Sequence, residues 1–194
     1  MKRRKVLTTG AALATSSWFS SWFIWPASAQ VQPTPDMVSI LRTGGCVVLL
    51  RHAQTEPGIG DPPNFKLEQC STQRNLSADG RVQSQRIGQW FKDRKLQARA
   101  VQSSPWCRCK DTADLAFGTY TVLPALASTF ENSAAQPSQT QTLRTLLRAI
   151  PAGQFEVWVT HQVNITALTG EVPAMGEAFM VANDSKVLAR TRFG

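Results

Sequence analysis

The sequence predicts an α/β sandwich with a mainly parallel central sheet. Short apolar runs alternate along the chain with longer segments of helical periodicity. The run Cys46–Leu50 is apolar at every position, which is typical of a strand covered by helices on both faces. Because strands that alternate with helices form sheets packed between helix layers, these two observations define the fold class.

The sequence predicts helices, strands and one long loop in the following order. Pro35–Arg42 favours a short helix that Gly44 and Gly45 end. Thr55–Asn75 is rich in Gly and Pro, has no periodicity, and predicts a long loop of the kind that carries function. Ser77 is a good N-cap for a helix that runs to about residue 94. The later predicted strands are 98–102, 121–126, 155–160, 178–181 and 187–192, and the later helices are 106–116, 143–150 and a short one from 165.

Charge and composition restrict the class of partner. The 194 residues include 21 Lys and Arg against 13 Asp and Glu, and 42% are hydrophobic. This is enough chain for one domain with a substantial core. Part of the basic excess lies at the N-terminus, and the mild remainder suits a small anionic substrate. No stripe of basic and aromatic residues alternates along the chain, so nucleic acid is not an expected partner.

The N-terminus has the layout of a secretory signal peptide. Lys2–Lys5 is basic, Val6–Trp25 is largely apolar, and Ala27–Ala29 offers an A-x-A cleavage site. We therefore expect a signal peptide at 1–29 and a single domain at 30–194 that is periplasmic or secreted, with no stable membrane span after cleavage. The Arg3-Arg4 pair fits twin-arginine as well as general export, and an uncleaved anchor helix is the alternative interpretation.

Each of the two histidines follows an apolar run. His52 comes after Arg51 at the end of one predicted strand, and His161 follows another. Ligands of parallel sheets bind beyond the carboxyl ends of the strands, so both histidines are expected on one rim. Arg108 lies in the first turn of a helix that follows a third strand. Two guanidiniums can hold phosphate oxygens, and a neutral imidazole between them can attack phosphorus.

Four motifs, in this order, resemble those of the histidine phosphatase superfamily, which is also called phosphoglycerate-mutase-like. "RHAQT" at 51–55 is similar to its R-H-G-E-T signature, and "NLSADG" at 75–80 to its L-S-x-x-G helix start. "SSPWCRCKDTA" at 103–113 resembles S-x-L-x-R-A-x-x-T-A, and "VWVTHQ" at 157–162 resembles the strand before the second histidine. The resemblance implies a three-layer α/β/α sandwich and points to a small exported bacterial branch.

The resemblance also implies catalytic roles. His52 would be the nucleophile that becomes phosphohistidine. Arg51 and Arg108 would bind the phosphoryl group, and Arg74 is a weaker candidate for the same contact. His161 would stabilise the transition state, which is mostly electrostatic work. No metal and no cofactor is expected.

The general acid is not fixed by the motifs. His161 is followed by Gln162, so the acid that follows this histidine in the phytase-like branch is missing. Glu131 could fill the place of the acid that the mutase branch carries after its third strand. Glu56 and Asp61 are alternatives in the long loop, and a good leaving group needs no acid.

All four cysteines follow the predicted signal peptide, in a chain expected in an oxidising compartment. Cys46 starts a strand far from the histidine rim and should be buried and reduced. We predict one disulfide from Cys70 to Cys107 or Cys109. Cys107 is favoured because Cys109 matches a small, inward-facing position of the family motif. Four free thiols are the alternative, and the Cys and His spacing does not fit a zinc site.

The resulting hypothesis is an exported phosphomonoesterase that acts through a phosphohistidine intermediate on a small phosphorylated substrate. Resemblance within the family suggests a phosphosugar such as a lipopolysaccharide-core heptose phosphate. The alternatives are a phosphoglycerate-mutase-type phosphotransferase and a non-catalytic module that binds phosphate or phosphosugar. The sequence does not predict the oligomeric state.

Overall fold

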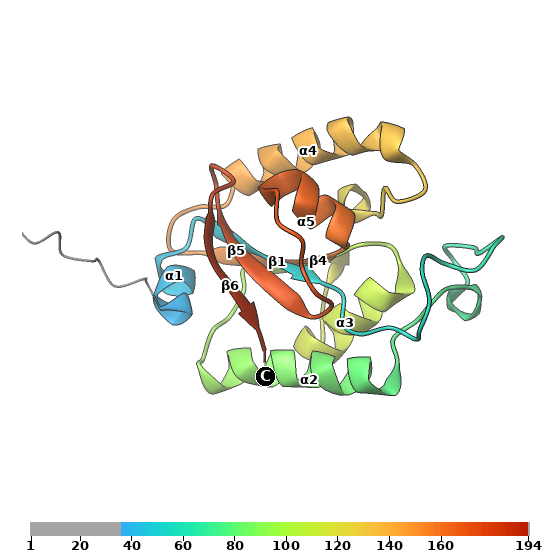
Figure 1. Ribbon diagram of the computed structural model, residues 1–194. Coiled ribbons are helices and arrows are strands. Elements are labelled where there is room, and N and C mark those ends of the chain that lie inside the picture. Colours follow the sequence, from blue (N-terminus) through green and yellow to red (C-terminus); the bar gives the residue numbers. More distant parts are fainter. Residues whose placement is uncertain (1–35, 194) are drawn as a thin grey trace, which may run out of the picture. The chain divides into compact units, whose positions relative to one another are not determined.

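A computed structural model describes residues 36–193, so the predicted signal peptide lies outside the described residues. A six-stranded sheet lies between two layers of helices, which confirms the predicted fold class (Figure 1). The strands are β1 (Cys46–Arg51), β2 (Ala100–Ser103), β3 (Thr121–Val122), β4 (Phe155–Thr160), β5 (Glu177–Ala182) and β6 (Val187–Arg192). The helices are α1 (Met37–Thr43), α2 (Ala78–Asp93), α3 (Cys107–Phe117), α4 (Gln136–Arg148) and α5 (Gln162–Thr169).

The strand order is β3-β2-β4-β1-β5-β6. Strands β1, β2, β3 and β4 pair in parallel, whereas β5 and β6 pair antiparallel at the other side of β1. The carboxyl ends of β1, β2 and β4 therefore meet at one edge of the sheet. This is the edge where a parallel sheet binds ligands.

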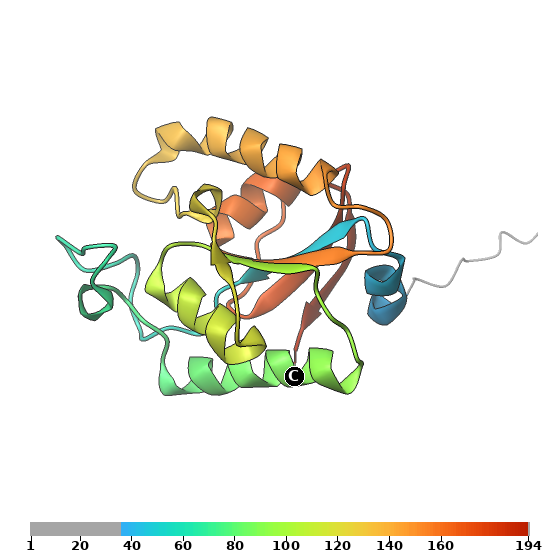
Figure 2. The ribbon, with the colours of Figure 1, turned by 180° about the vertical axis from the view of Figure 1, so that it is seen from behind.

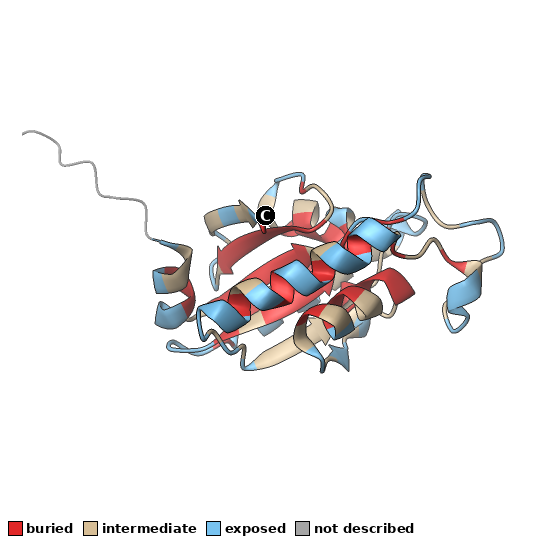
Figure 3. Ribbon diagram, turned by 90° about the horizontal axis from the view of Figure 1, so that it is seen from below, coloured by how far each residue is buried: buried red, intermediate tan, exposed pale blue. Residues whose placement is uncertain are grey.

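Alternate residues of β1 enter two different hydrophobic clusters. Val48 and Leu50 pack in a cluster with residues of α2 and α3, whereas Val47 and Leu49 pack in one with residues of α4 and α5. Figure 2 shows the two helix layers from behind, and Figure 3 shows buried strands beneath the exposed outer side of α2. Burial on both faces explains why this strand has no polar residue until Arg51.

The start of α2 is fixed against the chain that follows β1. Ser77 is the N-cap of α2, and its hydroxyl accepts a hydrogen bond from the Gly80 amide at 3.1 Å. The Ser77 amide in turn donates to the Gln54 carbonyl at 3.1 Å. A β-carbon at Gly80 would overlap this carbonyl, so only glycine allows the close approach. The "NLSADG" motif thus positions the backbone just beyond His52.

Two elements differ from the prediction made from sequence. The expected strand 121–126 is only two residues long as β3, because Pro124 cannot donate to the ladder and the chain turns into a 3₁₀ helix, Pro124–Leu126. Helix α4 begins at Gln136, earlier than its apolar pattern indicated. Of its apolar residues, Leu146 is 37% exposed, so it lies at the margin of the buried face.

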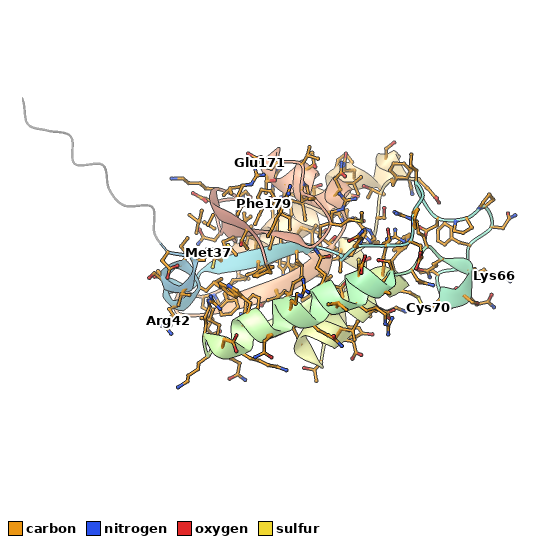
Figure 4. All side chains as sticks on the ribbon, turned by 60° about the horizontal axis from the view of Figure 1, so that its bottom comes forward. Met37, Arg42, Lys66, Cys70, Glu171 and Phe179 are labelled. Atoms are coloured by element: carbon orange, nitrogen blue, oxygen red, sulfur yellow. A yellow bond between two sulfur atoms is a disulfide. The ribbon has the colours of Figure 1, made fainter. Side chains whose placement is uncertain are left out.

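The structure contains the favoured disulfide, Cys70–Cys107, with a Cα–Cα distance of 5.6 Å. It joins the long loop after β1 to the first residue of α3. Cys46 and Cys109 are buried free thiols, as predicted. Figure 4 shows Cys70 at the opposite end of the domain from Met37 in α1, the helix that leads into Cys46.

We expect Cys70→Ser to destabilise the domain. The bond spans 37 residues of chain, and its removal frees that loop in the unfolded state, which costs on the order of 2–4 kcal/mol. Urea unfolding measures this change in the free energy of unfolding. Wild-type protein unfolded under a reducing agent is the control and should match the variant. Equal stability of the variant and the oxidised wild type would contradict the assignment.

Candidate active site

A pocket of about 340 Å³ lies at the carboxyl edge of the sheet. Its lining combines the ends of β1 and β4, the long loop, the start of α3 and the segment before α4. The structure brings all the predicted catalytic and phosphate-binding residues to this one pocket: Arg51, His52, Arg74, Arg108, Glu131 and His161. Of the alternative acids, Asp61 lines the pocket, whereas Glu56 is exposed and lies outside the lining.

His52 is buried, and both its backbone and its ring are fixed. Its amide donates to the Thr160 carbonyl of β4 at 3.0 Å. Ring Nδ1 lies 2.9 Å from the Ala53 carbonyl oxygen, which can only accept a hydrogen bond. Nδ1 therefore carries the proton, and Nε2 of the neutral ring carries the lone pair. This tautomer presents a nucleophilic nitrogen.

The two hydrogen bonds of Thr112 in α3 explain why the "CRCKDTA" segment has a threonine at this position. Its hydroxyl accepts a hydrogen bond from the Ala53 amide at 3.0 Å and donates to the Arg108 carbonyl at 2.7 Å. One buried side chain thus joins the backbone beside His52 to the helix that carries Arg108. The relative position of the histidine and this arginine is fixed by that bridge.

His161 is the N-cap residue of α5, directly after β4, and its ring centroid lies 5.5 Å from that of His52. Its Nε2 lies 2.8 Å from the Ser104 hydroxyl and 3.5 Å from the Cys109 sulfur. A hydroxyl that donates to Nε2 leaves the proton of the neutral ring on Nδ1. Ser104 is thus placed to make Nδ1 of His161 a hydrogen-bond donor.

Both imidazoles are kept neutral by their surroundings. Burial, and then the charge of Arg108, lower the pKa of His52 to about 3. Burial and Arg108, with smaller effects of His52 and Arg51, lower the pKa of His161 well below its usual value. Both rings are therefore unprotonated at neutral pH, and the lone pair of His52 Nε2 is available there.

Three guanidiniums make the pocket cationic. Arg51 donates to the Pro173 carbonyl at 2.8 Å, and Arg74 donates to the Thr55 hydroxyl at 2.6 Å. Burial lowers the pKa of Arg51, and the charges of Arg74 and Arg108 lower it further. This mutual repulsion among fixed cations is relieved when an anion enters, so the pocket favours a multiply charged anion such as a phosphate.

Asp61 is the partner of Arg108. Its two carboxylate oxygens accept from Arg108 Nη1 at 2.8 and 3.0 Å, and one of them also accepts from Trp106 Nε1 at 3.1 Å. The other accepts from the Arg74 amide at 3.0 Å. Asp61 thus anchors the long loop across the pocket, on the same helix start that the disulfide ties down.

Ser104 and the ion-pairing role of Asp61 were not found from sequence. Ser104 had a signal, since it lies in "SSP" between β2 and α3, where a side chain reaches the rim of the sheet. Asp61 had none, because a loop without periodicity does not show which of its residues folds back onto a helix.

We expect Ser104→Ala to change the tautomer of His161. Without the hydroxyl, Nε2 loses its fixed partner, and the ring is expected to populate both neutral tautomers. Nitrogen-15 NMR of the ring nitrogens reads this directly, since the chain has only two histidines.

Ser103→Ala is the matched control. Its hydroxyl is also buried but donates to the Ser104 carbonyl at 2.9 Å. This variant should leave the His161 spectrum unchanged. A single Nδ1–H tautomer retained in Ser104→Ala would contradict the role assigned to Ser104.

Residues 47–131 match the family described as histidine phosphatase superfamily (branch 1). The fold is similar to that of protein histidine phosphatase SixA complexed with tungstate, at 16% identity and a TM-score of 0.50, covering 76% of this chain and 97% of that one. It is also similar to the putative phosphohistidine phosphatase SixA from Agrobacterium tumefaciens, at 16% identity and a TM-score of 0.52, covering 77% and 98%. TTHB049 from Thermus thermophilus has 20% identity and a TM-score of 0.52, covering 75% and 98%.

No curated protein matches the sequence. The family match over residues 47–131 and the common fold agree with the histidine phosphatase superfamily that the motifs predicted. The match covers three of the four motifs, and the second histidine, His161, lies beyond it. At these identities the solved structures show that this chain shares their fold.

Proposed function

We propose that this protein is a phosphomonoesterase that hydrolyses a small phosphate ester through a phosphohistidine on His52. One observation carries the proposal. His52, held as the Nδ1–H tautomer by the Ala53 carbonyl, shares one pocket with three guanidiniums. A nucleophilic nitrogen and a cationic phosphate site in the same pocket are what phosphoryl transfer requires.

The steps follow from the geometry. Arg51, Arg74 and Arg108 bind the phosphoryl oxygens, and Nε2 of His52 attacks phosphorus. The bond from phosphorus to the ester oxygen breaks as the bond to Nε2 forms, and the ester oxygen leaves with the bonding electrons and takes up a proton to give the alcohol. Nδ1–H of His161 donates to a phosphoryl oxygen as charge develops there. Water then attacks the phosphohistidine, which releases phosphate and restores the imidazole.

Glu131 is the proposed proton donor to the leaving group when that group needs one. It is exposed and lines the pocket, so its carboxyl can exchange protons with solvent. Asp61 is a weaker candidate, because its two oxygens are held by Arg108 and Trp106. A leaving group that is stable as an anion departs without either carboxyl.

We further propose that the domain works outside the cytoplasm. The signal-peptide pattern of residues 1–29 supports this, and the Cys70–Cys107 disulfide fits an oxidising compartment. Within residues 36–193, no helix has the length and apolar character to cross a membrane. The heptose phosphate suggested by family resemblance is one candidate substrate, whereas the apolar residues at the pocket mouth favour a phosphate ester with an apolar part.

Release of phosphate from p-nitrophenyl phosphate tests the proposed function. A phosphatase gives continuous turnover, and a module that only binds phosphate gives none. A mutase would instead move the phosphoryl group between hydroxyls of one substrate and release little phosphate. Acid quenching should trap a phosphoryl adduct that is labile in acid and stable in base. Absence of turnover with intact, folded protein would overturn the proposal.

We expect activity to be insensitive to chelation. Three arginines supply the positive charge that a metal ion brings in other phosphatases, and the described part of the chain has no cluster of three or more metal-ligating side chains. The rate of phosphate release should be equal before and after dialysis against EDTA. A loss of activity that added divalent metal restores would contradict this prediction.

A further inference from the structure

The pocket mouth carries two of the most exposed large apolar side chains in the described domain. Ile59 is 92% exposed and Phe130 is 62% exposed, and both line the pocket. They come from different segments, the long loop after β1 and the turn before α4. A β-carbon at Gly60 would lie 3.9 Å from the Phe130 ring, so the two segments meet at the mouth.

Three further apolar side chains, those of Trp106, Val163 and Met175, line the same pocket. The Trp106 ring lies edge-on to His161, with 5.4 Å between ring centroids. Arg108 is buried with the two histidines, whereas the Arg74 guanidinium donates to the Gly58 and Gly60 carbonyls on either side of Ile59, so cationic and apolar groups line one cavity.

A cavity lined by both kinds of group suits a substrate with a charged and an apolar part. A sugar ring that enters the mouth would lose water from several hydroxyls, and each needs a polar partner. The polar side chains that line the pocket away from the arginines and histidines are few: Asp61, Ser128, Glu131 and Gln162. Asp61 is occupied by Arg108 and Trp106. An apolar group instead gains by covering Ile59 and Phe130.

We propose that the pocket takes a small phosphomonoester whose alcohol part is an apolar aromatic ring. The inference rests on the proposed phosphatase function and names its substrate class. The phosphoryl group binds the arginines, and the ring lies between Ile59 and Phe130, near Trp106. Aromatic side chains favour a flat ring through offset or edge-on contacts, in addition to the buried area.

The residue after His161 is Gln162, which has no acidic proton to give to a leaving group, and this fits the same substrate class. A phenolic oxygen leaves as a phenolate, which is far more stable than an alkoxide. The His52 Nε2–P bond forms as the P–O(aryl) bond breaks, the phenolate takes a proton from solvent, and water then releases phosphate from His52. The balance is ester plus water to phenol plus phosphate. An aryl ester therefore needs no strong proton donor beside His161.

Binding of phosphonates tests the inference without turnover. In a phosphonate the ester oxygen is replaced by a stable C–P bond, and calorimetry gives the affinity. We expect phenylphosphonate to bind at least about tenfold more tightly than methylphosphonate, because it buries a ring. Phe130→Ala should reduce this ratio to about threefold or less. Val172→Ala is the matched control, since Val172 is 63% exposed but lies outside the pocket, and it should keep the wild-type ratio.

Kinetics provide the second measurement. We expect kcat/KM for 1-naphthyl phosphate to exceed that for phenyl phosphate, whose leaving group has a similar pKa, and Phe130→Ala to remove the difference. Equal binding of the phenyl and methyl compounds, or tighter binding of octylphosphonate or glucose 6-phosphate than of phenylphosphonate, would overturn the inference. A phenyl preference without any hydrolysis would support the aromatic site and refute the phosphatase function instead.

Discussion

The His52→Ala variant is expected to release no phosphate above background from p-nitrophenyl phosphate. The change removes the nitrogen that we propose attacks phosphorus, and it leaves the three arginines in place. His161, the other imidazole of the pocket, is not expected to replace it, because its Nε2 lies within hydrogen-bond distance of the Ser104 hydroxyl. The activity assay is run beside acid-quench trapping, in which the wild type forms an adduct and the variant forms none.

The control for this variant is a measurement that its fold is intact. His52→Ala keeps the backbone bond to Thr160, and its thermal unfolding and its disulfide should remain those of a folded domain. Inorganic phosphate should still protect it against unfolding, since the arginines remain. A folded His52→Ala protein that turns over substrate would refute the phosphohistidine mechanism.

The two histidines also link stability to pH. The folded pKa of His52 is about 3, against an ordinary value of 6.5 that it regains when the chain unfolds. Between these values the unfolded chain binds a proton that the folded chain does not, so acidification from pH 7 toward pH 4 lowers the free energy of unfolding. His161 acts in the same direction. The His52→Ala variant removes one of these two contributions.

Much of the fold and site followed from local sequence. The unbroken apolar run of β1 predicted a strand covered on both faces, because such a strand has no face for polar side chains. Its end at Arg51 predicted the edge of the sheet where ligands bind. His52 and His161 directly follow β1 and β4, and Arg108 lies in the first turn of the helix after β2, so the sheet topology brings all three to one rim. Cys70 was predicted to pair with Cys107 or Cys109, and the motif favoured Cys107 because the position of Cys109 faces inward; the structure contains Cys70–Cys107.

The rest depends on tertiary contacts with no local signature. Asp61 lies in a loop without periodicity, and its role comes from Arg108 and Trp106, which are more than 40 positions away. Phe130 has no sequence pattern that marks it as a pocket residue, and its place in the pocket depends on Gly60 of the long loop, which lies beside its ring. Loop conformations of this kind are set by partners distant in sequence, and it is these loops that form the pocket mouth.

The Arg108→Ala variant should lose activity through the transition state. Its guanidinium is buried in the pocket, where we propose that it stabilises the charge that develops on the phosphoryl oxygens. We expect kcat/KM for p-nitrophenyl phosphate to fall more than about tenfold, equivalent to about 1.4 kcal/mol, with the loss mainly in kcat. Arg81→Ala, which removes an exposed arginine paired with Asp111, is the control and should retain wild-type kinetics.

The same substitution leaves Asp61 buried without its cation, and this effect must be separated from catalysis. The Arg108–Asp61 pair is nearly inaccessible to solvent, so removing one partner should destabilise the fold by about 3 kcal/mol. Arg108→Ala combined with Asp61→Asn removes both charges and should recover much of the stability but none of the activity. Activity regained in the double variant would mean that Arg108 acts by positioning the loop. A fall of less than about tenfold in kcat/KM of Arg108→Ala alone would mean that Arg108 does not bind the phosphoryl group.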